Sequence, residues 1–169
     1  MATSPETGPS FPRFSEMITR PHQIIALFGG LGLPTRGPGT WGTLGAFPLF
    51  WLLSTMPLSA KAAAYVGLLA VGTWAIVKTG RDLNAHDHRS IVIDEVIAMS
   101  LLLEIAVASW PSWILAFILF RIFDIAKPWP VYIPDRSPNG GFMVIADDLL
   151  AALWAAIVYV PVAWLLGWY

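Results

Sequence analysis

The stretch LLAALWAAIVYVPVAWLLGWY, residues 149–169, contains no charged residue over 21 positions. A helix that crosses the hydrocarbon core of a bilayer needs about 20 mainly apolar residues. This stretch therefore predicts a membrane-spanning helix.

Four further apolar stretches precede it, over residues 37–60, 62–77, 91–109 and 111–127. Together with residues 149–169 they predict about five hydrophobic helices. The helices expected over 91–109 and 111–127 are short enough to be only partly immersed. The sequence thus predicts an all-α fold, a polytopic membrane bundle in a single domain over residues 22–169. Residues 1–21 are polar and rich in Pro and Ser, so we expect a loose or surface-lying segment there.

The overall composition supports a lipid environment. The hydrophobic fraction is 56% and the charged fraction is 12%, whereas soluble domains have about 25% charged residues. A net charge of −1 without a basic run gives no reason to expect a nucleic-acid partner. The absence of cysteine excludes a cysteine-based phosphatase, a zinc–thiolate site and disulfides. A soluble helical bundle with a very apolar core is the alternative.

The distribution of basic residues predicts the orientation. If the expected helices alternate through a bilayer, nine of the ten Lys and Arg residues fall at one end, and only Lys61 falls at the other. The positive-inside rule assigns the basic end to the cytoplasm. Trp110, Trp164 and Tyr169 fall at the opposite ends of their helices, as expected for aromatic residues at a membrane interface.

The same alternation of helices through the bilayer places five carboxylates at the basic end, on three separate helices: Asp94, Glu95, Asp124, Asp147 and Asp148. A carboxylate within a membrane costs about 2.5–3.5 kcal/mol on insertion scales, and carboxylates held together repel one another. A hard divalent cation removes both costs, because Mg²⁺ prefers oxygen ligands. We therefore expect these five residues to be metal ligands.

Helix capping is the alternative role for these acids. The expected helix boundaries place Asp94, Glu95, Asp147 and Asp148 in first turns, where the helix dipole favours anions. Capping does not explain Asp124, which falls near the end of its helix. The two roles are compatible.

A second group of candidates lies just before the first expected helix, in the segment RGPGTWGT (residues 36–43). Glycines such as Gly39 permit close backbone approach, and amides at a helix N-terminus bind phosphate. The Arg36 guanidinium and the hydroxyls of Thr40 and Thr43 would add donors. A Gly/Pro loop before a helix is also common without any ligand.

The third group recurs every three residues, so that Arg121, Asp124 and Lys127 share one helical face until Pro128 ends the helix. Such a row is either a structural ladder of ion pairs or a clamp for a phosphate bridged to a metal. His86 and His88 flank Asp87 in a polar loop and could transfer protons, although loop histidines commonly have no special role.

Four segments, taken in order, resemble the phosphatidylglycerophosphatase A family: GLPTRGPGTWGTL (32–44), DHRSIVIDE (87–95), FRIFDIAKPWP (120–130) and NGGFMVIADD (139–148). The similarity extends from about residue 29 to residue 159. The family pattern usually has glycine three residues after the Asp-Glu pair, where this chain has Ala98. That change should affect packing more than chemistry.

The resemblance implies Mg²⁺-dependent removal of the terminal phosphate of phosphatidylglycerophosphate, giving phosphatidylglycerol, at the cytoplasmic side of a bacterial inner membrane. The catalytic residues would be Asp94, Glu95, Asp124 and Asp148, with Asp147 as a further ligand of one or two ions. The remaining candidates would bind the substrate phosphate: Arg36, Gly39, Thr40, Arg121 and Lys127. Either water or an aspartate could be the nucleophile, and the sequence does not fix the oligomeric state.

A small ion-coupled transporter is the alternative from another class, because acids within a membrane often mark ion pathways. A transporter favours acids at several depths and often a repeated topology, whereas here the acids gather at one end and no repeat is visible. Another lipid-headgroup enzyme is a third possibility, but the signatures of nucleotide-dependent phosphotransferases and of histidine-dependent lipid phosphatases are absent.

Overall fold

The computed structural model describes residues 11–135 and 140–169, and every regular element in this part of the chain is helical. The elements in chain order are α1 (Phe14–Met17), α2 (Pro21–Ala26), the 3-10 turn η1 (Phe28–Gly30), α3 (Pro38–Ser54), α4 (Leu58–Asp82), α5 (Ile93–Leu103), α6 (Trp110–Ala126), α7 (Tyr132–Asp135) and α8 (Gly141–Leu165). The all-α prediction is confirmed.

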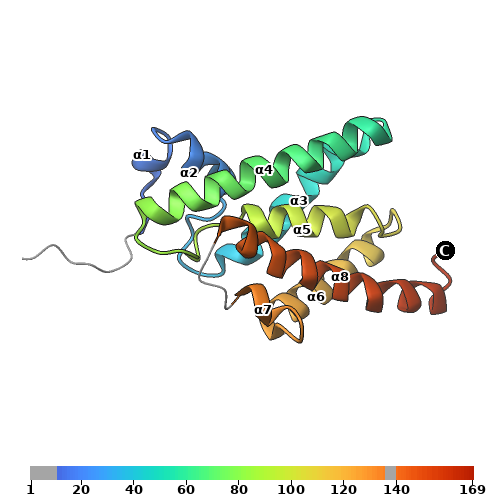
Figure 1. The fold of residues 1–169 in the computed structure, drawn as a ribbon. Helices are drawn as coiled ribbons and strands as arrows, with labels where there is room; N and C mark the ends of the chain where they lie inside the picture. Colours follow the sequence, from blue (N-terminus) through green and yellow to red (C-terminus); the bar gives the residue numbers. More distant parts are fainter. Residues whose placement is uncertain (1–10, 136–139) are drawn as a thin grey trace, which may run out of the picture.

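The five long helices, α3, α4, α5, α6 and α8, alternate in direction along one axis (Figure 1). The end that carries the start of α3, the loop over residues 83–92 and the start of α8 is called the polar end. The opposite end, called the far end, carries the turns over residues 55–57 and 104–109 and the C-terminal residues. Each long helix therefore joins the two ends.

Local sequence explains two of the helix boundaries. Gly37 has φ 61 and precedes Pro38, the first residue of α3, where proline fits without losing a helical hydrogen bond. Lys127 has φ 42 and ends α6, and Pro128 follows. The prediction for the last helix was wrong at its start, because α8 begins at Gly141 and not at residue 149.

Helix α5 lies in the middle of the bundle, packed on α3 and α8. Nine of its eleven residues are buried. The contact with α8 uses small side chains, since Ala98, Ala151 and Ala155 are all fully buried in one cluster. Ala98, the position where the family pattern has glycine, therefore lies in this packed core, away from the polar end.

The outer surface of the bundle is apolar. Helices α4 and α8 are long and apolar enough to cross a membrane, and only 22% of the most apolar window of α4 is buried. On α6 and α8, exposed positions include Ile118 and Ile157. A soluble bundle would bury such residues, so this surface favours the membrane interpretation. Helices α3, α5 and α6 are shorter, with 17, 11 and 17 residues.

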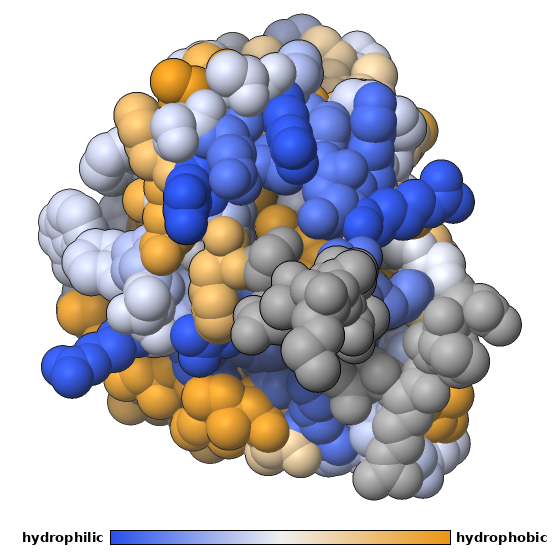
Figure 2. Space-filling model, turned by 90° about the vertical axis from the view of Figure 1, so that its left-hand side faces the viewer, coloured by the Kyte–Doolittle hydropathy of each residue, from blue (hydrophilic) through white to orange (hydrophobic). Residues whose placement is uncertain are grey.

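The polar end gathers hydrophilic side chains: Figure 2 shows blue residues spread over this face, with orange apolar residues most prominent along its lower left. At the far end, Lys61 Nζ donates to Glu104 Oε2 at 2.7 Å, and the Tyr65 hydroxyl donates to Oε1 at 3.2 Å. Glu104 is therefore paired. The single basic residue predicted opposite the others thus neutralises an acid at the far end of the bundle.

Candidate active site

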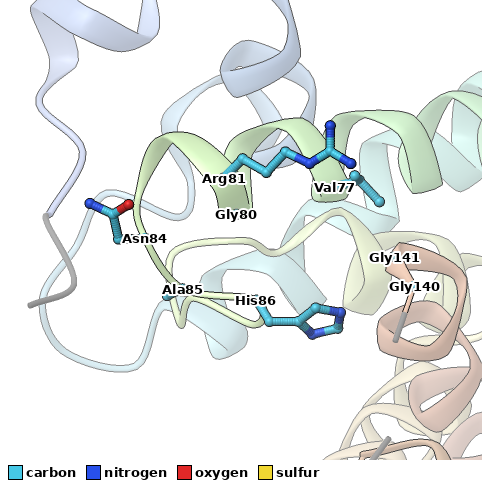
Figure 3. A pocket seen from close by; sticks show the side chains of 8 residues that line it. All are labelled: Val77, Gly80, Arg81, Asn84, Ala85, His86, Gly140 and Gly141. Carbon is cyan, nitrogen blue, oxygen red and sulfur yellow. The ribbon is translucent and has the colours of Figure 1, made fainter. Parts of the chain in front are cut away.

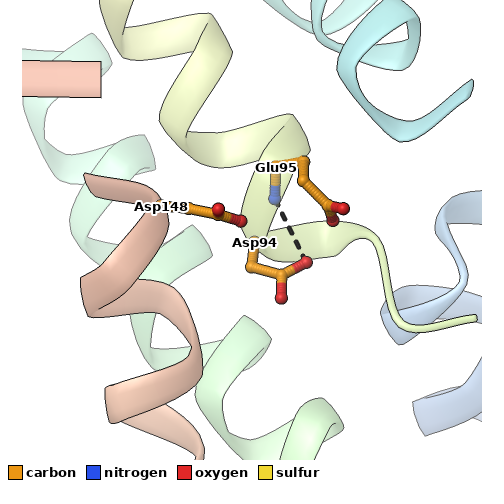
Figure 4. Close-up of side chains that lie close together, drawn as sticks. All are labelled: Asp94, Glu95 and Asp148. Carbon is orange, nitrogen blue, oxygen red and sulfur yellow. Dashed lines mark hydrogen bonds between the residues drawn. The ribbon is translucent and has the colours of Figure 1, made fainter. Parts of the chain in front are cut away.

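Three carboxylates converge at the polar end (Figure 4). Asp94 and Glu95 lie in the first turn of α5, and Asp148 lies in the second turn of α8. One carboxylate oxygen from each of the three lies within 4.8 Å of the other two. Asp94 and Asp148 are each only 5% exposed, so water alone does not screen their mutual repulsion.

Asp124 joins this group from a third helix. It lies in the last turn of α6, and its carboxylate is close enough to those of Glu95 and Asp148 to interact with them electrostatically. The Arg121 Nη1 atom donates to Asp124 Oδ2 at 2.5 Å. The four residues expected to be catalytic thus lie together, drawn from α5, α6 and α8.

The start of α3 closes one side of the cluster. A Cβ atom added to Gly39 would collide with Glu95 Oε1 and lie 3.2 Å from Arg121 Nη1. Any larger residue at position 39 would therefore displace the Glu95 carboxylate. Arg121 Nη1 also lies 3.5 Å from the hydroxyl of Thr43, which is fully buried. Arg121 accordingly connects α6 to both α3 and the carboxylates.

Two residues predicted to bind phosphate lie outside this cluster. Arg36 and Thr40 are both exposed, and Arg36 forms no ion pair with any residue that the structure describes. The backbone of the segment approaches the carboxylates at Gly39, whereas these two side chains remain at the surface of the polar end.

Asp147 and Lys127 form a separate pair. Lys127 Nζ donates to Asp147 Oδ2 at 2.7 Å. Adjacent residues on a helix point in different directions, so Asp147 faces Lys127 while Asp148 faces the cluster. The expectation that both acids sit in a first turn was wrong, because α8 starts six residues before Asp147. Their position in α8 therefore does not result from capping.

The carboxylate cluster fits a divalent metal ion. Asp94, Glu95 and Asp148 form no ion pair with any described residue. Glu95 Oε2 is buried and accepts no hydrogen bond within the described part of the chain. Buried charges are normally paired or bound to metal, and carboxylate oxygens are the ligands that Mg²⁺ and Ca²⁺ prefer. The donor set thus suits a hard cation.

The loop over residues 83–92 borders a second polar feature, an open cavity of about 600 Å³ next to the start of α8. Figure 3 shows Arg81, Asn84 and His86 on its wall. His88 is 3% exposed and accepts a hydrogen bond at Nδ1 from Ser90 N–H at 3.2 Å. Burial lowers the pKa of His88, the Arg89 charge acts in the same direction, and Asp87 opposes them.

Sequence reasoning missed one polar cluster. Asp82, the last residue of α4, accepts hydrogen bonds from Arg20 at 3.0 Å and from Gln23 at 3.2 Å, and it pairs with His22 at 2.7 Å. These contacts fix α2 onto α4. No sequence signal marked them, because each residue on its own resembles an ordinary polar surface residue.

The chain is similar to known proteins over most of its length. The family model described as phosphatidylglycerophosphatase A matches residues 24–163. Phosphatidylglycerophosphatase A of Escherichia coli is 33% identical over 154 residues, covering 89% of each chain. The Haemophilus influenzae protein of the same name is 39% identical over 145 residues, covering 83% of this chain and 88% of the relative.

A further relative, from Bacteroides thetaiotaomicron, carries the name "Putative phosphatidylinositol-3-phosphatase"; it is 34% identical over 160 residues, covering 88% of this chain and 99% of the relative. No solved structure matches the chain. The family match spans the start of α3, the Asp-Glu pair of α5, the Arg-Asp-Lys row of α6 and the two aspartates of α8. The chain belongs to the phosphatidylglycerophosphatase A family.

Proposed function

We propose that this chain hydrolyses the terminal phosphomonoester of phosphatidylglycerophosphate with the help of Mg²⁺, at the cytoplasmic face of a bacterial inner membrane. One water is consumed, the P–O bond to the glycerol headgroup breaks, and the released alkoxide takes up a proton. The products are phosphatidylglycerol and inorganic phosphate. The convergence of carboxylates from α5, α6 and α8 is the observation that carries the proposal.

The metal ligands in this proposal are Asp94, Glu95 and Asp148, with Asp124 beside them. A Mg²⁺ ion bound there would polarise the phosphate oxygens and orient the nucleophile. Asp147 is held by Lys127, so in this proposal it supports the position of Asp148 on α8 and is a ligand only for a second ion.

The phosphate would be held by the cations and amides around this cluster. Arg121 already lies between Gly39 and Asp124, where its guanidinium would neutralise charge that develops on the phosphate oxygens. Lys127 would add a second positive charge from the end of α6. Arg36 and Thr40, on the exposed segment before Gly39, would approach the phosphate from the solvent side.

A membrane topology is also part of this proposal. We propose that α3, α4, α5, α6 and α8 are embedded in the bilayer, with the polar end in the cytoplasm. A lipid phosphate lies at the interface, so the headgroup would meet the carboxylates while the acyl chains stay among the apolar helix surfaces. The basic residues near the polar end, such as Lys78 and Arg81 in the last turns of α4, agree with the positive-inside rule.

A headgroup panel tests the proposed function. Purified protein would be assayed for phosphate release from phosphatidylglycerophosphate, phosphatidic acid and phosphatidylinositol 3-phosphate, with Mg²⁺ and with chelator. We expect the first substrate to be preferred and its hydrolysis to stop in chelator. The name of one relative includes an inositol lipid, and preference for phosphatidylinositol 3-phosphate would reassign the substrate. Full activity in chelator would contradict the metal mechanism.

A further inference from the structure

Two apolar grooves lie along α6, and Phe117 lines both of them. One, of about 360 Å³, lies between α3 and α6 and is lined by Leu44, Phe47, Trp113 and Ile114 among others. The other, of about 450 Å³, lies on the outer face of α6 between Phe117 and Ala126. Together they form what is called here the α6 groove.

The α6 groove exists because α3 and α6 pack against different neighbours. Helix α3 packs mainly on α5, and α6 packs mainly on α8, so the two helices have little backbone contact with each other. Side chains bridge them at both ends. The Phe47 and Trp113 rings lie 6.2 Å apart towards the far end, and Arg121 reaches Thr43 at the polar end.

The groove leads to the carboxylate cluster. Arg121 lines it with its side chain, while its guanidinium donates to Asp124 and lies against Gly39. Arginine commonly lies with its methylene stem on an apolar surface and its charge in a polar region. One residue thus belongs both to the apolar groove and to the proposed phosphate site.

The dimensions suit one lipid tail. The part of the groove between Trp110 and Arg121 spans eleven residues of α6, which corresponds to about 16 Å of helix. Half of the hydrocarbon core, the depth of one leaflet, is about 15 Å. Ile114 and Ile118 are 57% and 47% exposed on the groove wall, so the groove opens sideways, where lipid surrounds the helices.

We propose that the α6 groove binds one acyl chain of the phospholipid substrate and so positions its headgroup phosphate at Arg121 and the carboxylates. This inference rests on the proposed function, because it names the part of the same substrate that the groove holds. It assigns Leu44, Phe117 and Ile114 to substrate binding through the tail rather than through the phosphate.

Kinetics on substrates of two chain lengths test the inference. Ile114→Trp would fill the groove, and Ile157→Trp is the matched control, since Ile157 lies on α8 with a similar exposure of 53%. For Ile114→Trp we expect kcat/KM on dioleoyl phosphatidylglycerophosphate to fall about tenfold or more, with the rate on the dihexanoyl analogue nearly unchanged. The control should match the wild type on both.

Two other results would overturn the inference: an equal loss on both chain lengths, which indicates a structural defect, or no loss on either. A wild-type protein that is inactive on both substrates would instead contradict the proposed function.

Photolabelling of the wild type gives a second measurement that requires no groove variant. A phosphatidylglycerophosphate with a diazirine in its acyl chain should label α3 and α6 around Leu44 and Ile114, and excess unlabelled substrate should prevent this. Equal labelling by a photoreactive phosphatidylcholine would show that the groove holds bulk lipid, and labelling between two copies of the chain would show a dimer contact; either result would overturn the inference.

Discussion

The ammonium group of Lys127 lies 2.7 Å from a carboxylate oxygen of Asp147, and this pair joins the end of α6 to α8 directly beside Asp148. The Asp147 side chain is 8% exposed and that of Lys127 is 27% exposed. The two neighbouring aspartates therefore lie in different electrostatic environments. Asp147 has a cation next to it, whereas Asp148 lies among carboxylates.

Removal of the Lys127 charge should affect both stability and catalysis. Lys127→Ala takes the cation away from a buried carboxylate, a change that costs about 3–5 kcal/mol in the buried pairs studied. We expect a lower melting temperature in detergent and slower phosphate release. Adding Asp147→Asn should restore the melting temperature without restoring turnover. If the double variant regains full turnover, Lys127 does not contact the phosphate.

Neutralising the central carboxylates should stop the reaction without unfolding the protein. Asp148→Asn and Asp124→Asn should each lower kcat by at least about a hundredfold, comparable to the loss of one preorganised electrostatic group in other enzymes. Glu104→Gln is the control, because Glu104 pairs with Lys61 at the far end. Wild-type rates for either Asp variant would remove that residue from the site.

The close approach of α3 to the carboxylates gives a steric prediction. Gly39→Ala places a methyl group against the Glu95 carboxylate, and small displacements of catalytic groups cost about a hundredfold in rate. Gly67→Ala on α4 is the matched control, since its Cβ would meet nothing within 4 Å. We expect turnover to fall only in Gly39→Ala. Equal turnover in the two variants would show that the Glu95 position is not critical.

Buried His88 should make the fold sensitive to mild acid. Its folded pKa is lowered, so the unfolded chain takes up a proton more readily, and stability falls as the pH drops below the ordinary His value of about 6.5. His88→Asn retains an acceptor for Ser90 N–H but does not titrate. Melting temperatures measured from pH 7.5 to pH 5 should therefore fall more for the wild type than for this variant. If the melting temperatures of the two proteins fall equally over this pH range, His88 is not the cause of the acid sensitivity.

The sequence predicted the convergence of the acids because alternation of apolar helices determines which loops lie at the same end. That alternation alone was enough to predict that Asp94, Glu95 and Asp124 lie at the same end. The start of α8 was not predictable by hydropathy, since Asp147 and Asp148 interrupt the apolar run although both are buried inside the helix.

Side-chain directions were the other feature that the sequence could not supply. The row Arg121–Asp124–Lys127 predicted a shared face, but only the packing of α6 on α8 shows that Lys127 pairs with Asp147 while Arg121 pairs with Asp124. Arg36 was expected at the phosphate by its position in a glycine-rich segment. Its exposed side chain shows that the backbone of this segment, at Gly39, makes the close contact.

The central claim is that Asp94, Glu95 and Asp148 share one divalent cation, and metal binding itself tests this most directly. Purified protein would be titrated with Mn²⁺ and the free ion measured by electron paramagnetic resonance, for the wild type and for the double variant Glu95→Gln/Asp148→Asn. The account predicts that the wild type binds Mn²⁺ in competition with Mg²⁺ and that the folded double variant does not. Equal Mn²⁺ binding by the two proteins would contradict it.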